Sequence, residues 1–213
     1  MFFDPDEDFT EKWGGRLPHR HQNGTIQFVT FHLNDSLPQS VLNDLEEWIT
    51  TFYKLNPKPW NTSTENRFRN YVSPYKQRML DAGYGSCVLK YSDIREILSS
   101  ALFFKDEDNY LIHALVIMPN HVHMLIEPFG PHEIEDILHS VKTFSARKIN
   151  KVIGSSGKLW QRESWDRLVR SACHYDYCLE YIKKNPRFLP PDRYTLYIRN
   201  FENNKERRPP CLR

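Results

Sequence analysis

The sequence has no apolar run of the ~20 residues that a helix needs to cross a bilayer. Its first stretch, MFFDPDEDFTEKW, is acidic and lacks the basic start and the apolar middle of a signal peptide. The four cysteines form no CxxC pair and show no metal-ligand spacing, which favours free thiols in a reducing compartment. We therefore expect a soluble, cytoplasmic protein with no membrane partner.

The length and composition fit one folded domain with short extensions. The chain has 213 residues, of which 39% are hydrophobic and 14% aromatic, which is enough for a core. Its charges are unevenly distributed: residues 1–130 hold 12 basic and 17 acidic residues, whereas residues 131–213 hold 17 and 10. A basic half favours a polyanionic partner, although chance clustering on a solvated surface explains these charges equally well.

Hydrophobic patterns predict an alternation of strands and helices, while residues 56–74 show no clear period and are expected to form a loop. The order predicts an α+β fold with helices packed on a mainly antiparallel sheet. The expected elements are a strand at 25–33, a helix opened by Pro38, a helix capped by Ser92, paired strands at 111–118 and 121–126, a helix with an apolar stripe from Ile134 to Ile149, a stretch extended at the start of 159–169, and a helix capped by Ser171 that ends near Asn185.

Two histidines, His121 and His123, lie one residue apart in the apolar run LIHALVIMPNHVHMLIEP. Alternate residues of a strand point to the same face, so both imidazoles project together while Val122 and Met124 face the core. Such a pair can bind one divalent ion. The alternative is a pair of ordinary buried histidines, but burying two unpartnered imidazoles is costly. We favour a metal site that takes a third ligand from elsewhere.

The last long helix, SACHYDYCLEYIKKNP, places Tyr181 and Asn185 one turn apart on one face. Of its three tyrosines, Tyr175, Tyr177 and Tyr181, only Tyr181 has an amide oxygen at the fourth following position. Taken alone, the pattern is explained more simply by packing of Tyr181 and capping by Asn185. Only the combination with the histidine pair favours a chemical role.

Four segments occur in the order MPNHVHMLIEP, VKTFSARKIN, LWQRESWDRLVRS and YCLEYIKKNP. This order resembles the REP-associated tyrosine transposases, which belong to the HUH superfamily of single-strand DNA transposases with one catalytic tyrosine. By that resemblance His121 and His123 form the HUH motif, Tyr181 is the nucleophile and Asn185 is the third metal ligand. The resemblance also implies a ferredoxin-like sandwich, with an antiparallel sheet that carries the His-x-His strand and helices packed on one face.

The resemblance covers about residues 25–186 and divides the chain into three parts. We expect a polar N-terminal extension at 1–24, a catalytic domain at 25–186 and a Pro-rich basic tail at 187–213, which leaves room for a short element. The chain enters this tail as NPRFLPPD, where family members commonly continue with NPVKAG. This departure leaves the recognition of a DNA hairpin undefined.

The implied function is metal-dependent nicking and joining of single-stranded DNA at hairpins formed by palindromic repeats. Tyr181 attacks the phosphodiester and forms a 5′-phosphotyrosine, with Mg²⁺ or Mn²⁺ as the cofactor and a monomer or homodimer as the acting form. Three alternatives stay open. They are a domesticated protein that binds hairpin DNA without cleaving it, a metal-dependent phosphodiesterase that uses water, and a non-enzymatic RNA-binding module.

Basic residues near the last two predicted helices are candidates for DNA contacts. Binding through such residues should weaken steeply with salt. Trp160 and Trp165 are further candidates, either as stacking surfaces for bases or as core residues. The basic candidates are Lys142, Arg147, Lys148, Arg162, Arg167, Arg170, Lys183 and Lys184.

Overall fold

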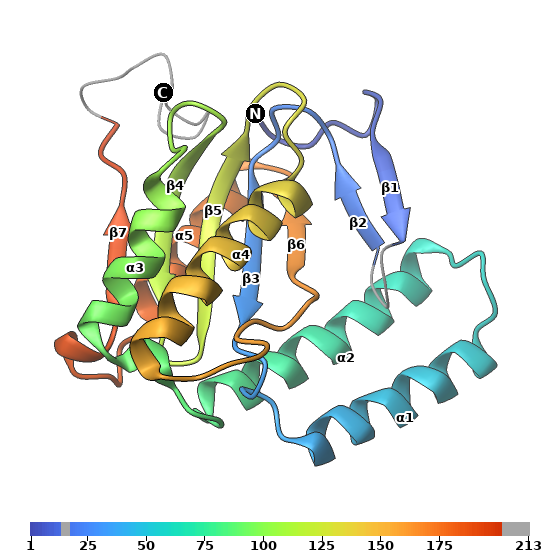
Figure 1. The fold of residues 1–213 in the computed structure, drawn as a ribbon. Helices are drawn as coiled ribbons and strands as arrows, with labels where there is room; N and C mark the ends of the chain where they lie inside the picture. The colour runs from blue at the N-terminus through green and yellow to red at the C-terminus, as the bar shows by residue number, and fades with distance from the viewer. Residues whose placement is uncertain (14–17, 202–213) are drawn as a thin grey trace.

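The computed structural model describes residues 1–13 and 18–201, and a five-stranded antiparallel sheet forms its centre (Figure 1). The strand order is β6-β3-β5-β4-β7. Without β7, this order and the helices between the strands are those of a ferredoxin-like sandwich. The α+β class, the antiparallel sheet and the central position of the His-x-His strand are confirmed. The strands are β3 (Gln27–His32), β4 (Tyr110–Ile117), β5 (His121–Pro128), β6 (Trp165–Leu168) and β7 (Thr195–Ile198).

Helices cover both faces of this sheet. The helices α3 (Ser92–Phe103) and α4 (Ile134–Ile153) pack on one face, where they enclose the largest hydrophobic cluster. The helix α5 (Ala172–Lys184) packs on the opposite face (Figure 1). The expectation that the helices lie on one face is right for α3 and α4, which lie between the strands of the ferredoxin-like unit. It is wrong for α5, which follows the last of those strands and covers the opposite face of the sheet.

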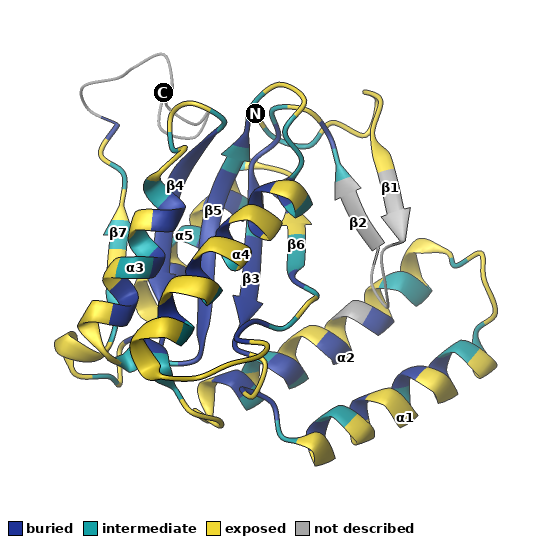
Figure 2. Ribbon diagram, in the orientation of Figure 1, coloured by how far each residue is buried: buried dark blue, intermediate teal, exposed yellow. Residues whose placement is uncertain are grey.

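The strand β5 contributes alternate residues to the two faces. Val122 and Met124 are fully buried in the cluster beneath α3 and α4. His121 and His123 point the other way, and Leu125 in the same row packs in the cluster beneath α5. Figure 2 shows that β5 is buried along nearly its whole length. The two imidazoles are therefore placed under α5, in a layer shielded from water.

A helical hairpin of α1 (Gln39–Leu55) and α2 (Thr62–Asp81) extends from one side of the sheet (Figure 1). The predicted loop at 56–74 is wrong, because most of it is the first half of α2. Asn61 caps this helix by accepting a hydrogen bond from the backbone of Thr64, at 2.9 Å. Tertiary packing of aromatic rings between α1 and α2 stabilises a helix whose own sequence has little apolar period.

Both ends of the described chain return to the body of the protein. Short strands β1 (Thr10–Trp13) and β2 (Pro18–His21) form a separate hairpin, and the backbone of Phe3 donates to Val169 at 2.9 Å. Beyond the boundary expected at residue 186, β7 pairs with β4, and the Arg199 guanidinium forms ion pairs with Asp106 and Glu107. The segment from residue 187, expected to be a tail, therefore contributes a strand to the sheet.

Local details of the termini of the helices test the predicted caps. Ser171 caps α5 as predicted and accepts from the backbone of His174 at 3.2 Å. Ser92 does not cap α3, because the helix already begins at that residue and Tyr91 occupies the cap position. Short 3-10 turns, Val88–Lys90 and Pro191–Arg193, complete the described elements. Among the described residues, no helix is long and apolar enough to span a membrane.

Candidate functional site

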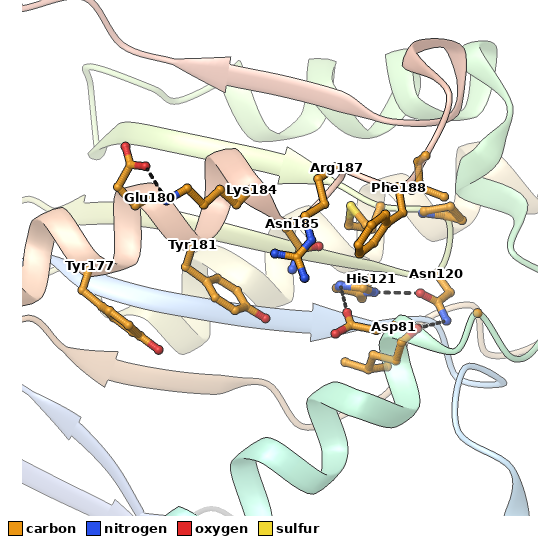
Figure 3. A pocket seen from close by; sticks show the side chains of 15 residues that line it. Asp81, Asn120, His121, Tyr177, Glu180, Tyr181, Lys184, Asn185, Arg187 and Phe188 are labelled. Atoms are coloured by element: carbon orange, nitrogen blue, oxygen red, sulfur yellow. Dashed lines mark hydrogen bonds and ion pairs between the residues drawn. The ribbon is translucent and has the colours of Figure 1, made fainter.

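A pocket of about 520 Å³ lies where the end of α2, the turn before β5 and the end of α5 meet. Its lining includes four of the predicted site residues, His121, Tyr181, Lys184 and Asn185. In Figure 3 the hydroxyl of Tyr181 points toward the part of the pocket where His121 and Asp81 lie. The predicted convergence of the strand histidines and the helix tyrosine therefore occurs within a single chain.

Asn120 sets the orientation of the His121 ring. Its Nδ2 donates to the backbone oxygens of Leu80, at 3.1 Å, and Tyr84, at 3.2 Å. Carbonyl oxygens only accept, so Asn120 Oδ1 is the atom that faces His121 Nδ1, at 2.7 Å. Because an amide oxygen also only accepts, Nδ1 carries the proton and His121 Nε2 presents a lone pair.

Thr30, on the neighbouring strand β3, holds His123. Thr30 Oγ1 lies 2.7 Å from His123 Nδ1, and Phe28 stacks on the same imidazole with ring centroids 5.6 Å apart. Burial lowers the pKa of His123 to about 3. Burial also lowers the pKa of His121 well below its usual range, and the neighbouring His123 and His32 lower it further. Both imidazoles are therefore neutral at pH 7, the state in which histidine binds metals.

Tyr181 packs edge-on against the His123 ring, with centroids 5.1 Å apart, and against Phe28, at 5.7 Å. Burial raises the pKa of its phenol above the ordinary value, and the Asp81 carboxylate raises it further. Asn185 is the C-cap residue of α5, and its backbone N–H donates to Tyr181 O at 3.0 Å. The simpler roles considered for these residues are therefore both observed: Tyr181 packs in the interior and Asn185 caps α5. The packing of Tyr181 also brings its ring against His123.

Three buried polar atoms of this site have no hydrogen-bond partner: His121 Nε2, His123 Nε2 and Asn185 Oδ1. Leaving such atoms unpaired costs about 1–3 kcal/mol each, so each calls for an explanation. His121 Nε2 and Asn185 Oδ1 offer lone pairs, and His123 Nε2 offers one in the tautomer whose Nδ1–H donates to Thr30 Oγ1, so the set suits a divalent cation. Within residues 1–13 and 18–201, no three His, Cys, Asp or Glu side chains are arranged to hold a metal ion, so the set depends on the amide of Asn185.

Asp81, the last residue of α2, brings a carboxylate to the same pocket. Its Oδ1 lies 4.0 Å from His121 Nε2 and accepts a hydrogen bond from Gln77 Nε2 at 2.7 Å. Burial raises the pKa of Asp81, while the hydrogen bond from Gln77 and the charge of Arg187 act in the opposite direction. Neither Asp81 nor Asn120 is predicted from the sequence, because no sequence pattern reveals α2 and Asn120 carries no motif of its own apart from the following histidines.

The basic residues predicted to contact DNA are divided between the faces of the sheet. Lys142, Arg147 and Lys148 lie on α4, across the sheet from Tyr181. Lys142 donates to two backbone oxygens of residues 161–162, at 3.1 and 3.2 Å, and burial lowers its pKa to about 8. The structure therefore does not bring these three residues to the pocket. The hydrogen bonds of Lys142 instead stabilise the backbone of the segment at 161–162, before β6.

The other five candidates are exposed on the surface. Lys183 and Lys184 both pair with Glu180, at 3.0 and 3.3 Å, and Lys184 lines the pocket. Arg167 on β6 faces α5, close enough for its charge to act on Cys178. The five residues are Arg162, Arg167, Arg170, Lys183 and Lys184.

The two tryptophans differ in their surroundings. Trp160 is a core residue, with its ring 5.1 Å from that of Phe31 and its indole N–H donating to Ser145 at 2.9 Å. Trp165 is half-buried beside the His32 ring, at 5.3 Å, with the Lys76 ammonium 4.3 Å from its own ring. The core alternative considered for Trp160 is the right one.

The role of Thr30 leads to a testable expectation. Replacing it with Val keeps the shape but leaves the buried His123 Nδ1 without its partner. We expect the free energy of unfolding to fall by about 1–3 kcal/mol, as measured by urea unfolding. The exposed Thr143 on α4 offers the control, and Thr143→Val should leave the stability unchanged.

Comparisons with known proteins identify the family of the central segment. The family model described as "Transposase IS200 like" matches residues 82–185, from the residue after Asp81 to the C-cap of α5. No curated protein matches significantly. Among solved structures, the chain is similar to a REP-associated tyrosine transposase bound to a REP hairpin. The identity is 16%, the TM-score is 0.42, and the match covers 78% of this chain and 68% of that one. The matched residues 82–185 contain the histidine pair, the tyrosine and the asparagine, so the site lies in the segment that is similar to the IS200-like transposases.

Proposed function

We propose that this chain nicks and joins single-stranded DNA at hairpins formed by palindromic repeats, with Tyr181 as the nucleophile. The observation that carries the proposal is the 5.1 Å contact between the rings of Tyr181 and His123, beside three unpartnered lone pairs. The match of residues 82–185 to the model of a transposase family supports the same chemistry. The contact joins residues of one chain, which supports a site that needs no second subunit, so a monomer is sufficient and a homodimer is not required.

In this proposal His121, His123 and Asn185 hold Mg²⁺ or Mn²⁺. When bound, the cation neutralises charge on the phosphate and polarises it for attack. Asn120 and Thr30 keep both Nε2 lone pairs aimed at it, because each occupies the other nitrogen of one ring. These two residues are positioning residues, since they act through the imidazoles.

Tyr181 carries out the covalent step. Its phenolic oxygen forms a bond to phosphorus and loses its proton, the bond from phosphorus to the 3′ oxygen breaks, and the leaving strand ends in a 3′-OH. The raised pKa of the phenol means that it is protonated in the resting site, so attack requires positive charge beside it. Because the phosphotyrosine keeps the energy of the ester, a 3′-OH can reverse the step and join strands.

A second candidate is a protein that binds hairpins without cutting them. The exposed basic residues Arg167 and Arg170 suit phosphate contacts in either case. The unpartnered Nε2 atoms favour the enzyme, because a protein that only binds DNA has no need of buried lone pairs beside a phenol.

The deciding experiment uses single-stranded hairpins with randomised flanks, labelled at the 3′ end. With Mn²⁺ we expect label to migrate with the protein on a denaturing gel, and mass spectrometry to find the adduct on Tyr181. EDTA should abolish it. Released fragments without an adduct would indicate hydrolysis by water, and retention of intact hairpin alone would indicate the binding protein.

A further inference from the structure

The three groups with free lone pairs beside Tyr181 are all electrically neutral. Burial keeps His121 and His123 uncharged, and Asn185 contributes an amide. Mg²⁺ and Mn²⁺ are hard cations, for which carboxylate, carbonyl and water oxygens are the preferred ligands. A site that binds such an ion firmly therefore calls for an acidic group in addition to these three.

Asp81 stands in the right place to be that group. Its Oδ1 is 4.0 Å from the unpartnered His121 Nε2. This separation is too long for a hydrogen bond, and it places a negative charge beside the lone pair that would hold the ion. The hydrogen bond from Gln77 turns the carboxylate, which lines the same pocket as Tyr181 and Asn185.

The position of Asp81 relative to His121 is fixed by the fold. The preceding residue, Leu80, is 1% exposed, and its backbone oxygen accepts from the amide of Asn120. The same amide accepts from His121 Nδ1, so one side chain links the end of α2 to the imidazole. The carboxylate and the lone pair of His121 are therefore held by one hydrogen-bonded unit.

Glu180, the other acid lining the pocket, is engaged elsewhere. Its two carboxylate oxygens pair with Lys183, at 3.0 Å, and Lys184, at 3.3 Å. These pairs neutralise the charge of Glu180 at the surface of α5. Of the two acids in the lining, only Asp81 lies within 4.0 Å of a histidine proposed as a ligand.

We propose that Asp81 is the anionic residue of the cation site, supplying the negative charge that helps His121, His123 and Asn185 hold a divalent ion. The inference rests on the proposed function, in which those three residues bind the ion. Asp81 directly precedes the segment 82–185 that matches the transposase family. The helix α2 thus completes the site from outside that segment.

The test is the binding of Mn²⁺ alone to the full chain without DNA, followed by the paramagnetic resonance signal of the free ion. Asp81→Asn should weaken binding at least about tenfold, and Asp81→Glu should restore part of the affinity. Glu180→Gln is the matched control, since it removes one negative charge from the same pocket, and it should stay within about twofold of wild type. Asp81→Ser is measured alongside, with urea unfolding in EDTA, so that a folding defect in one variant does not decide the result.

Equal affinity in wild type and Asp81→Asn would overturn the role of Asp81, as would equal losses in Asp81→Asn and Glu180→Gln, which would indicate a general effect of charge. The adduct assay separates this inference from the function. Normal Mn²⁺ binding by Asp81→Asn together with an adduct on Tyr181 in the wild type overturns only the role of Asp81. Weakened Mn²⁺ binding together with a wild-type chain that forms no adduct supports the cation site and overturns only the cleavage.

Discussion

Replacing Tyr181 with Phe should reduce the yield of covalent protein–DNA adduct by at least about 10³-fold, because the nucleophilic oxygen is lost. The change keeps the ring that packs on His123 and Phe28, at 5.1 and 5.7 Å. We therefore expect the fold, the binding of Mn²⁺ and the affinity for hairpin DNA to persist. The measurement is the amount of labelled DNA attached to the protein after denaturation, at saturating hairpin and Mn²⁺.

Tyr177 provides the control for this variant. It lies one turn earlier on α5 and is 66% exposed, so Tyr177→Phe removes a hydroxyl from the same helix without touching the histidines. Adduct formation in this variant should stay within about twofold of wild type. A Tyr181→Phe protein that still captured DNA covalently would show that another side chain is the nucleophile.

Acidification should destabilise the protein strongly in the absence of metal. Burial lowers the pKa of His32 to about 4 and that of His123 to about 3, below the usual histidine value near 6.5. Between the folded and unfolded pKa values the unfolded chain binds more protons than the folded one. The contribution of these imidazoles to the free energy of unfolding is therefore complete above pH 6.5 and decreases as the pH falls below it. His32 and His123 should each lower the free energy of unfolding by about 2 kcal/mol at pH 5 relative to pH 7.5, and His121, whose pKa burial also lowers, should add to this loss.

Urea unfolding in EDTA at the two pH values measures this loss. The variant His123→Gln should reduce the difference between pH 7.5 and pH 5 by about 2 kcal/mol, because one buried titrating group is gone. The exposed His139 on α4 is the matched control, and His139→Gln should leave the difference unchanged. If the wild type were equally stable at both pH values, the imidazoles would not be buried as neutral groups.

Local patterns in the sequence were sufficient to predict the centre of the fold. The alternation around His121 and His123 identified β5 and the face on which both rings lie, and Ser171 and Pro186 marked the ends of α5. These signals are local, since strand alternation and helix caps involve residues within a few positions of one another. The juxtaposition of Tyr181 with His123 could be expected only from the resemblance to a family.

The parts that escaped prediction depend on contacts between distant residues. The helix α2 is stabilised by aromatic rings that pack against α1, such as Phe68, whose ring centroid is 5.3 Å from that of Phe52. Pro74 lies inside α2, and a proline within a segment argues against a helix when only the sequence is considered. Without α2 there was no reason to consider Asp81, which comes within 4.0 Å of His121 across 40 residues of sequence. The placement of α4 across the sheet from Tyr181 likewise follows from topology, which the charges of its lysines do not reveal.

The sharing of β5 between core and pocket has a consequence for how this protein can evolve. Val122 and Met124 fill the core beneath α3 and α4, while His121 and His123 lie on the face that carries the pocket and α5, all within four consecutive positions. Inserting or deleting one residue in the tight turn at 118–120 would turn each side chain of β5 to the opposite face of the sheet. The aliphatic side chains would then face Tyr181, and the imidazoles would be buried in the hydrophobic core. Such an indel would disrupt the core and the pocket together, so this turn should tolerate changes of residue type far better than changes of length.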